Sequence, residues 1–92
     1  MQYQCSGLPK TTLLGLDDAI AYFKAQLHPG RVGHIVAMGG EPLPALTLDY
    51  QIDFEGTVHV VSALTDDLPQ PDHDAWAAVI DQYHNSSTGG LA

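Results

Sequence analysis

Residues 46–64 read LTLDYQIDFEGTVHVVSAL, and this stretch decides the fold. From Leu46 to Phe54, apolar residues occupy every second position and polar residues lie between them. This alternation is typical of a β-strand with one buried and one solvated face. Residues 57–64 are rich in β-branched side chains and predict a second strand. The short polar segment between the two strands indicates an antiparallel hairpin.

The length of the turn decides which residues face each other across this hairpin. A two-residue turn at Glu55 and Gly56 would place Ile52 opposite His59 and would mix polar with apolar residues on both faces. A three-residue turn at residues 54–56 pairs apolar residues with one another: Ile52 with Val58, Tyr50 with Val60, and Leu46 with Leu64. It also puts Gly56 at the left-handed position that a type I turn with a bulge requires. We therefore predict the three-residue turn.

Two segments with helical spacing flank the strands. In the first, five apolar residues share one helical face: Leu16, Ala19, Ile20, Phe23 and Leu27. Asp17 and Asp18 lie at the positive N-terminal end of this helix, which favours carboxylates. The sequence His28-Pro29-Gly30 ends this helix. The second helix carries its stripe at Trp76, Val79, Ile80 and Tyr83. We expect Asp72 to cap it, Asp74 to lie in its first turn, and the prolines of residues 65–71 to forbid regular structure before it.

The remaining segments complete an α+β fold. Residues 1–5 alternate and predict an edge strand, and residues 32–38 predict a strand that ends at Gly39-Gly40 and a turn at residues 41–44. The order is (β)αβββα, which favours a small antiparallel sheet of three, or with residues 1–5 four, strands with both helices on one face. We expect one domain over residues 1–84 and a flexible, glycine-rich tail over residues 85–92.

The charge distribution is the most unusual property of the composition. The chain has eleven acidic residues and three residues of the Lys and Arg type, which are Lys10, Lys24 and Arg31. After Arg31 there are nine carboxylates and no Lys or Arg. Nucleic acids and anionic membranes are bound through Lys and Arg, so this balance argues against both as direct partners. It favours a basic surface of another protein as the partner. The alternative is that the charge only maintains solubility.

Other general features predict a protein of the cytoplasm. Cys5 is the only cysteine, so no disulfide can form within the chain. We see no apolar run long enough to cross a bilayer, and no basic segment followed by an apolar stretch that would predict a signal peptide.

Motifs for chemistry are weak, and we expect neither enzymatic activity nor a cofactor or metal. No nucleophile signature surrounds Cys5 or any serine, and Gly39-Gly40 is followed by Glu41 and Pro42, which disfavour phosphate binding. Asp81 and His84 form one carboxylate-x-x-His unit, whereas di-iron bundles need two. His59 with Asp49 is another possible pair.

The element order αβββα resembles that of double-stranded-RNA-binding domains. Those domains need Lys and Arg to reach phosphates, and the second helix here has neither. The resemblance therefore implies a similar topology without RNA binding.

The carboxylates fall into two groups. Those at helix starts are explained by the helix dipole, whereas Asp49 and Asp53 lie on the solvated face of a strand, where aspartate is disfavoured. The predicted partner-binding residues are these two together with their neighbours: Asp49, Asp53, Glu55, Asp66, Asp67, Gln51 and His59. The alternative is a solvated face that discourages edge aggregation.

These observations favour a non-enzymatic inhibitor or adaptor, of the kind that phages and mobile elements encode, which occupies a basic nucleic-acid-binding surface of a target protein. Anti-CRISPR, anti-restriction and uracil-DNA-glycosylase inhibitor proteins resemble it in size and acidity only. Two alternatives remain open: an immunity protein or secretion-type chaperone, and a phage structural component. The sequence leaves the oligomeric state open.

Overall fold

The computed structural model describes residues 1–37 and 44–89, with side chains described as far as Tyr83. The elements are β1 (Tyr3–Cys5), α1 (Leu16–Ala25), β2 (Val32–Ala37), β3 (Leu46–Ile52), β4 (Val58–Leu64) and α2 (Gln70–Gly89). The predicted α+β class and the order βαβββα are confirmed. The turn predicted at residues 41–44 lies, except for Pro44, outside the described residues.

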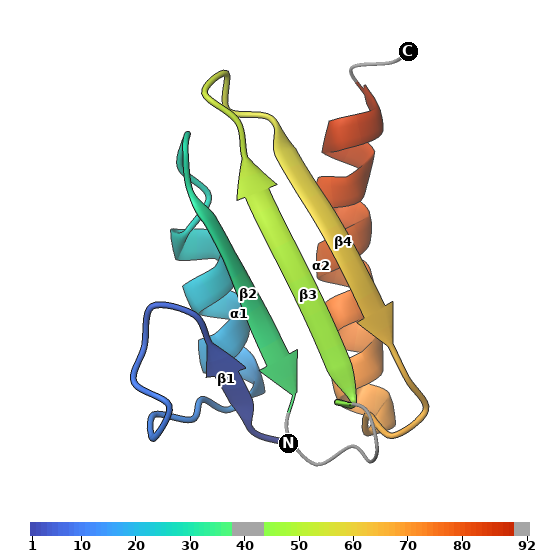
Figure 1. Ribbon diagram of the computed structural model, residues 1–92. Helices are drawn as coiled ribbons and strands as arrows, with labels where there is room; N and C mark the ends of the chain where they lie inside the picture. Colours follow the sequence, from blue (N-terminus) through green and yellow to red (C-terminus); the bar gives the residue numbers. More distant parts are fainter. Residues whose placement is uncertain (38–43, 90–92) are drawn as a thin grey trace.

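One antiparallel sheet carries the strands in the order β1-β2-β3-β4, and both helices cover the same face of it (Figure 1). The predicted N-terminal edge strand is therefore present: β1 gives the sheet four strands, and its Cys5 lies opposite Ile35 of β2. The hairpin has the predicted register, because Tyr50 lies opposite Val60 and Leu46 opposite Leu64. Gly56 has the expected positive φ of 89°. Alternation in the sequence thus sets the register of the hairpin.

The core lies between the sheet and the two helices. Its largest fully buried side chains come from both layers: Trp76, Tyr3, Phe23, Ile35, Leu46 and Leu48. The Phe23 ring lies at the centre and packs edge-on against Tyr50 at a centroid distance of 5.4 Å and against Tyr83 at 5.5 Å. The predicted core positions of Trp76 and Tyr50 are confirmed, and neither ring is available as an exposed anchor.

The start of α2 corrects three predictions. The helix begins at Gln70, so the prolines did not keep residues 70 and 71 out of regular structure. Pro71 is tolerated there because the first turn of a helix leaves its N–H groups without intrahelical acceptors. Asp72 is not the cap, and Asp74 lies beyond the first turn. Asp74 instead accepts a hydrogen bond of 2.7 Å from the side-chain amide of Gln70.

The end of α2 extends past the predicted domain boundary. The helix continues to Gly89, although we expected the domain to end at residue 84. Residues 90–92 of the predicted tail lie outside the described residues, and the flexibility of the tail stays a prediction. No helix within the described ranges has the length and apolar character needed to span a membrane.

A buried hydrogen bond joins the two ends of the fold. The Tyr3 hydroxyl on β1 donates to Oδ2 of Asp72 on α2 at 2.7 Å, and both side chains are buried. Burial raises the pKa of Tyr3, and the neighbouring Asp72 raises it further, so the phenol stays protonated and remains the donor. Asp72 therefore belongs to the core, where it fastens the short edge strand to the last helix.

We expect Tyr3→Phe to destabilise the fold by about 1–3 kcal/mol, because it leaves the Asp72 carboxylate buried without its donor. Urea denaturation followed by circular dichroism measures this loss. The double variant Tyr3→Phe/Asp72→Ala removes both polar groups and should recover part of it. A Tyr3→Phe protein as stable as the wild type would contradict the role assigned to this bond.

Candidate functional site

The sheet face opposite the helices is the candidate site. The register alternates side chains between the two faces, so this outer face carries the residues that lie between the core positions. At its centre three strands meet in two rows: Val32, Gln51 and His59 in one, and His34, Asp49 and Val61 in the next. All six side chains are exposed. The predicted solvated face is thus a mixture of carboxylate, imidazole, amide and valine groups.

These two rows enclose a shallow, open groove of about 370 Å³. Gly33 and Tyr50, whose side-chain positions face the helices, also line it. A Cβ atom at Gly33 would overlap the Tyr50 hydroxyl and would lie 2.6 Å from Oγ of Ser6. Glycine is therefore needed here so that the Tyr50 ring can pack beneath the strand.

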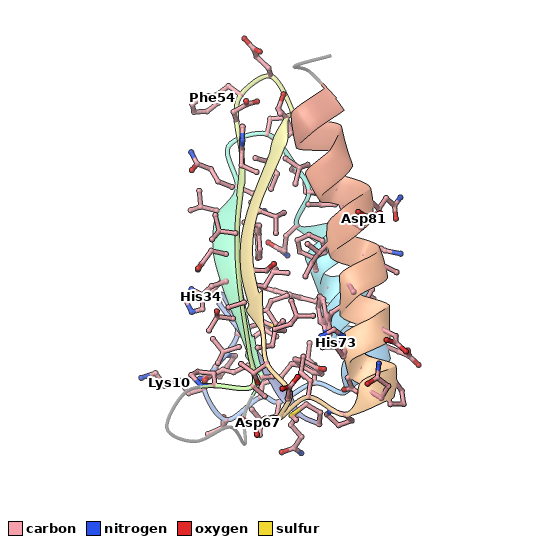
Figure 2. All side chains as sticks on the ribbon, turned by 90° about the vertical axis from the view of Figure 1, so that its right-hand side faces the viewer. Lys10, His34, Phe54, Asp67, His73 and Asp81 are labelled. Atoms are coloured by element: carbon pink, nitrogen blue, oxygen red, sulfur yellow. The ribbon has the colours of Figure 1, made fainter. Side chains whose placement is uncertain are left out.

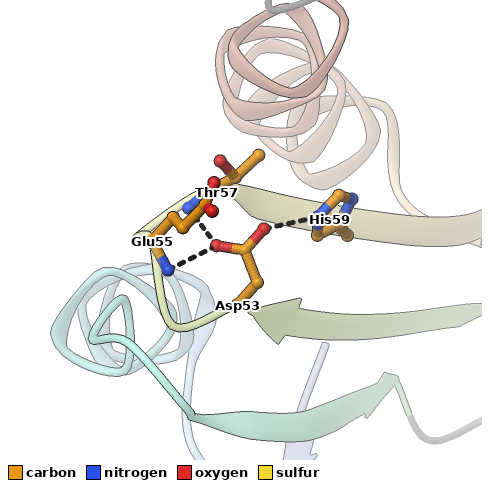
Figure 3. A network of polar contacts seen from close by, with 4 residues as sticks. All are labelled: Asp53, Glu55, Thr57 and His59. Atoms are coloured by element: carbon orange, nitrogen blue, oxygen red, sulfur yellow. Dashed lines mark hydrogen bonds and ion pairs between the residues drawn. The ribbon is translucent and has the colours of Figure 1, made fainter.

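Asp53 has a structural role that the sequence did not reveal (Figure 3). Its Oδ1 accepts hydrogen bonds from the backbone N–H groups of Glu55 and Thr57, both at 2.9 Å, and its Oδ2 lies 3.3 Å from Nε2 of His59. The bond from Thr57 is the largest cause of a lowered Asp53 pKa, and His59 and Glu55 act in the same direction. We expected an aspartate without an internal partner, but this carboxylate caps the β3–β4 turn.

The predicted binding residues do not form one patch. Asp49, Gln51 and His59 line the groove, whereas Asp53 and Glu55 lie at the turn between β3 and β4. Asp66 and Asp67 are exposed in the loop after β4, at the other end of the hairpin (Figure 1). Seven strand residues separate these ends by about 20 Å. A single small ligand therefore could not touch all of them, but a protein surface could.

Three residues of this face were not predicted from the sequence. His34 and Val32 belong to β2, and His34 points away from the helices in Figure 2. Phe54 at the β3–β4 turn is 91% exposed. The pairing of β2 with β3 would have found His34, because it places this residue directly opposite Asp49. That register depends on the length of the turn between β2 and β3. Glycines and prolines are spread over residues 38–45, so the sequence does not fix this length.

The described residues offer little for metal or nucleophilic chemistry. No three His, Cys, Asp or Glu side chains gather closely enough among them to hold a metal ion. Cys5 is buried, and burial raises its pKa, which disfavours the reactive thiolate. His84, proposed with Asp81 as a carboxylate-x-x-His unit, has its side chain outside the described part. What this face can do is present hydrogen-bonding, charged and apolar groups to another surface.

Comparison with protein-family models, curated proteins and solved structures found no match to this chain.

We expect Asp53→Asn and Asp49→Asn to differ in their effect on stability, although both remove one carboxylate from the same strand. Asp53→Asn weakens three contacts at the turn and should lower Tm by about 5 °C. Asp49 is exposed and its carboxylate forms no hydrogen bond with the described residues, so Asp49→Asn should leave Tm within about 1 °C. Thermal denaturation of the two variants measures the difference, and equal Tm values would contradict the capping role.

The same carboxylate predicts an acid-sensitive turn. Because the folded pKa of Asp53 lies below its ordinary value, ionised Asp53 stabilises the fold above about pH 4 and this contribution is lost as the pH falls through the folded pKa. The amide signals of Glu55 and Thr57 should therefore titrate together in NMR spectra recorded from about pH 6 to about pH 2. In Asp53→Asn this shared titration should be absent.

Proposed function

We propose that this protein binds a basic surface of another protein through the outer face of its sheet and acts there as a non-enzymatic inhibitor or adaptor. The observation that carries the proposal is a solvent-facing sheet surface with the exposed carboxylates of Asp49 on β3 and Glu55 at the adjoining turn, and no Lys or Arg on any of its strands. A partner whose Lys and Arg residues normally contact nucleic acid would fit such a surface.

The centre of the face supports contact with a protein. Val32 and Val61 are 68% and 73% exposed, and they flank the polar groups of the groove. Protein interfaces commonly combine apolar side chains with polar, hydrated groups, and the outer face offers both. The carboxylates of Asp49 and Glu55 would then contribute long-range attraction and orientation, and the valines would contribute buried area.

Because Asp53 has a structural role, the proposed binding depends mainly on other carboxylates. Asp53 is held by its own turn, so most of its hydrogen-bonding capacity is already used within the chain. Asp49 and Glu55 have exposed side chains, and within the described part of the chain their carboxylates form no hydrogen bond. Asp66 and Asp67, at the other end of the hairpin, would extend the contact only for a partner that spans its whole length. We place this binding in the cytoplasm, in keeping with the single, buried cysteine.

The test is affinity purification from a lysate of the encoding organism, with quantitative mass spectrometry at about 50 mM and about 500 mM NaCl. A nucleic-acid-binding protein should be captured at low salt and released at high salt. Asp49→Asn/Glu55→Gln should weaken its binding by about tenfold, which corresponds to about 1.4 kcal/mol. Duplex DNA or RNA added to the purified pair should compete for the target.

The matched control is Asp17→Asn/Asp18→Asn, which removes the same charge from exposed positions at the start of α1. Because α1 covers the opposite face of the sheet, this variant should bind the target as the wild type does. Binding that resists salt, or that falls equally in both double variants, would remove the proposal.

A further inference from the structure

β4 is an edge strand of the sheet, and half of its backbone hydrogen-bonding groups point away from β3. In an antiparallel pair, residues that exchange backbone hydrogen bonds alternate with residues whose backbone groups point away. Asp53 donates to the Thr57 carbonyl and Thr65 donates to the Ala45 carbonyl, both at 3.0 Å, so the residues of β4 bonded to β3 are His59, Val61 and Ala63. The backbone groups of Val58, Val60, Ser62 and Leu64 therefore point outward.

These outward groups have no recorded acceptor or donor within the described residues. Figure 2 views the molecule from this side, with α2 beside β4, and Figure 1 shows that the C-terminal half of α2 extends past the β4 edge on the helix side of the sheet. The opposite edge of the sheet is different. There the N–H and C=O of Tyr3 both bond to Leu14, and the Cys5 carbonyl accepts from Leu8. The chain thus closes one edge of its sheet and leaves the other open.

The composition of β4 suits it to pairing. Edge strands that avoid association carry charges, prolines or bulges, whereas VHVVSAL over residues 58–64 contains no Lys, Arg, Asp, Glu or Pro and pairs with β3 without a bulge. Val61, at the centre of the strand, is 73% exposed on the outer face. On the helix side, an apolar groove of about 320 Å³ lies next to the same strand and is lined by Leu64, Ala77 and Ile80 together with His73 and Asp81.

We propose that β4 pairs antiparallel with β4 of a second copy of this chain, about a two-fold axis at Val61, to form a dimer with one continuous sheet. In this register Val58 of each copy bonds with Leu64 of the other, and Val60 bonds with Ser62, so all outward backbone groups find partners. The two Val61 side chains meet across the axis at a non-hydrogen-bonded position, where side chains approach most closely.

A second copy fits this edge because the strand complements itself. No Lys, Arg, Asp or Glu lies on β4, and His59 of each copy would face Ala63 of the other, so pairing opposes no like charges along its length. Since the described chain has one open edge, pairing ends at two copies and does not propagate. The acidic residues stand at the two ends, where Glu55 of one copy approaches Asp66 and Asp67 of the other. Salt should therefore strengthen this dimer, whereas it should weaken binding to a basic partner.

Sedimentation equilibrium of the full chain tests the proposal from about 10 µM to about 1 mM protein. We expect a reversible monomer–dimer equilibrium with no larger species, and a tighter dimer at about 500 mM than at about 50 mM NaCl. Val61→Lys places two ammonium groups together at the axis and should raise the Kd at least about tenfold. Val32→Lys makes the same change at a similarly exposed position of the outer face, on β2, and should leave the Kd unchanged.

A covalent test gives a second measurement that does not depend on how Val61→Lys folds. In a glutathione redox buffer, Val61→Cys should form a disulfide-linked dimer much faster than Val32→Cys, because the two residues at position 61 face each other across the axis. Cys5 is buried and should not compete. A monomer at every concentration, growth beyond two copies, an unchanged Kd in a folded Val61→Lys protein, or equal cross-linking rates would each overturn the proposal.

Discussion

The alignment of β3 with β4 is the constraint on which the rest of the structure depends. Asp53 accepts hydrogen bonds from two backbone N–H groups of the turn, and Gly56 supplies the left-handed residue that the turn needs. If the alignment slipped by one residue, Tyr50 and the leucines of β3 would face solvent and the carboxylate of Asp49 would face the core. The core, the outer face and the free edge all follow from this one alignment.

Alternation made the hairpin predictable from sequence, because apolar residues at every second position permit only one buried face. The helices were predictable for a similar reason, since their apolar stripes match the period of 3.6 residues. The start of α2 was not predicted. Proline breaks a helix when it lies in the interior but is accepted in the first turn, and the sequence alone did not show which position Pro71 takes. Asp72 was predicted to cap α2 because an aspartate near a helix start commonly does so. Its carboxylate instead accepts a hydrogen bond from Tyr3, which sequence spacing does not reveal.

Much of the candidate site also followed from the sequence. Asp49, Gln51 and His59 were placed on the outer face by parity, and the structure brings them to one groove. His34 was missed because no local signal fixes how β2 pairs with β3. The role of Asp53 was missed because it depends on where the carboxylate lies relative to the turn N–H groups, which composition and spacing do not define. Sequence therefore identified the face, and coordinates were needed to sort its carboxylates.

The bond between Tyr3 and Asp72 has a consequence for synthesis of the chain. Its two residues are 69 positions apart, so β1 cannot complete its contacts until the beginning of α2 has left the ribosome. Contacts between distant positions form slowly because a long loop must close first. The central hairpin can fold early from local contacts. The pairing of β1 with β2 can also form before α2 is made, so among these contacts only the bond to Asp72 must wait for the last helix.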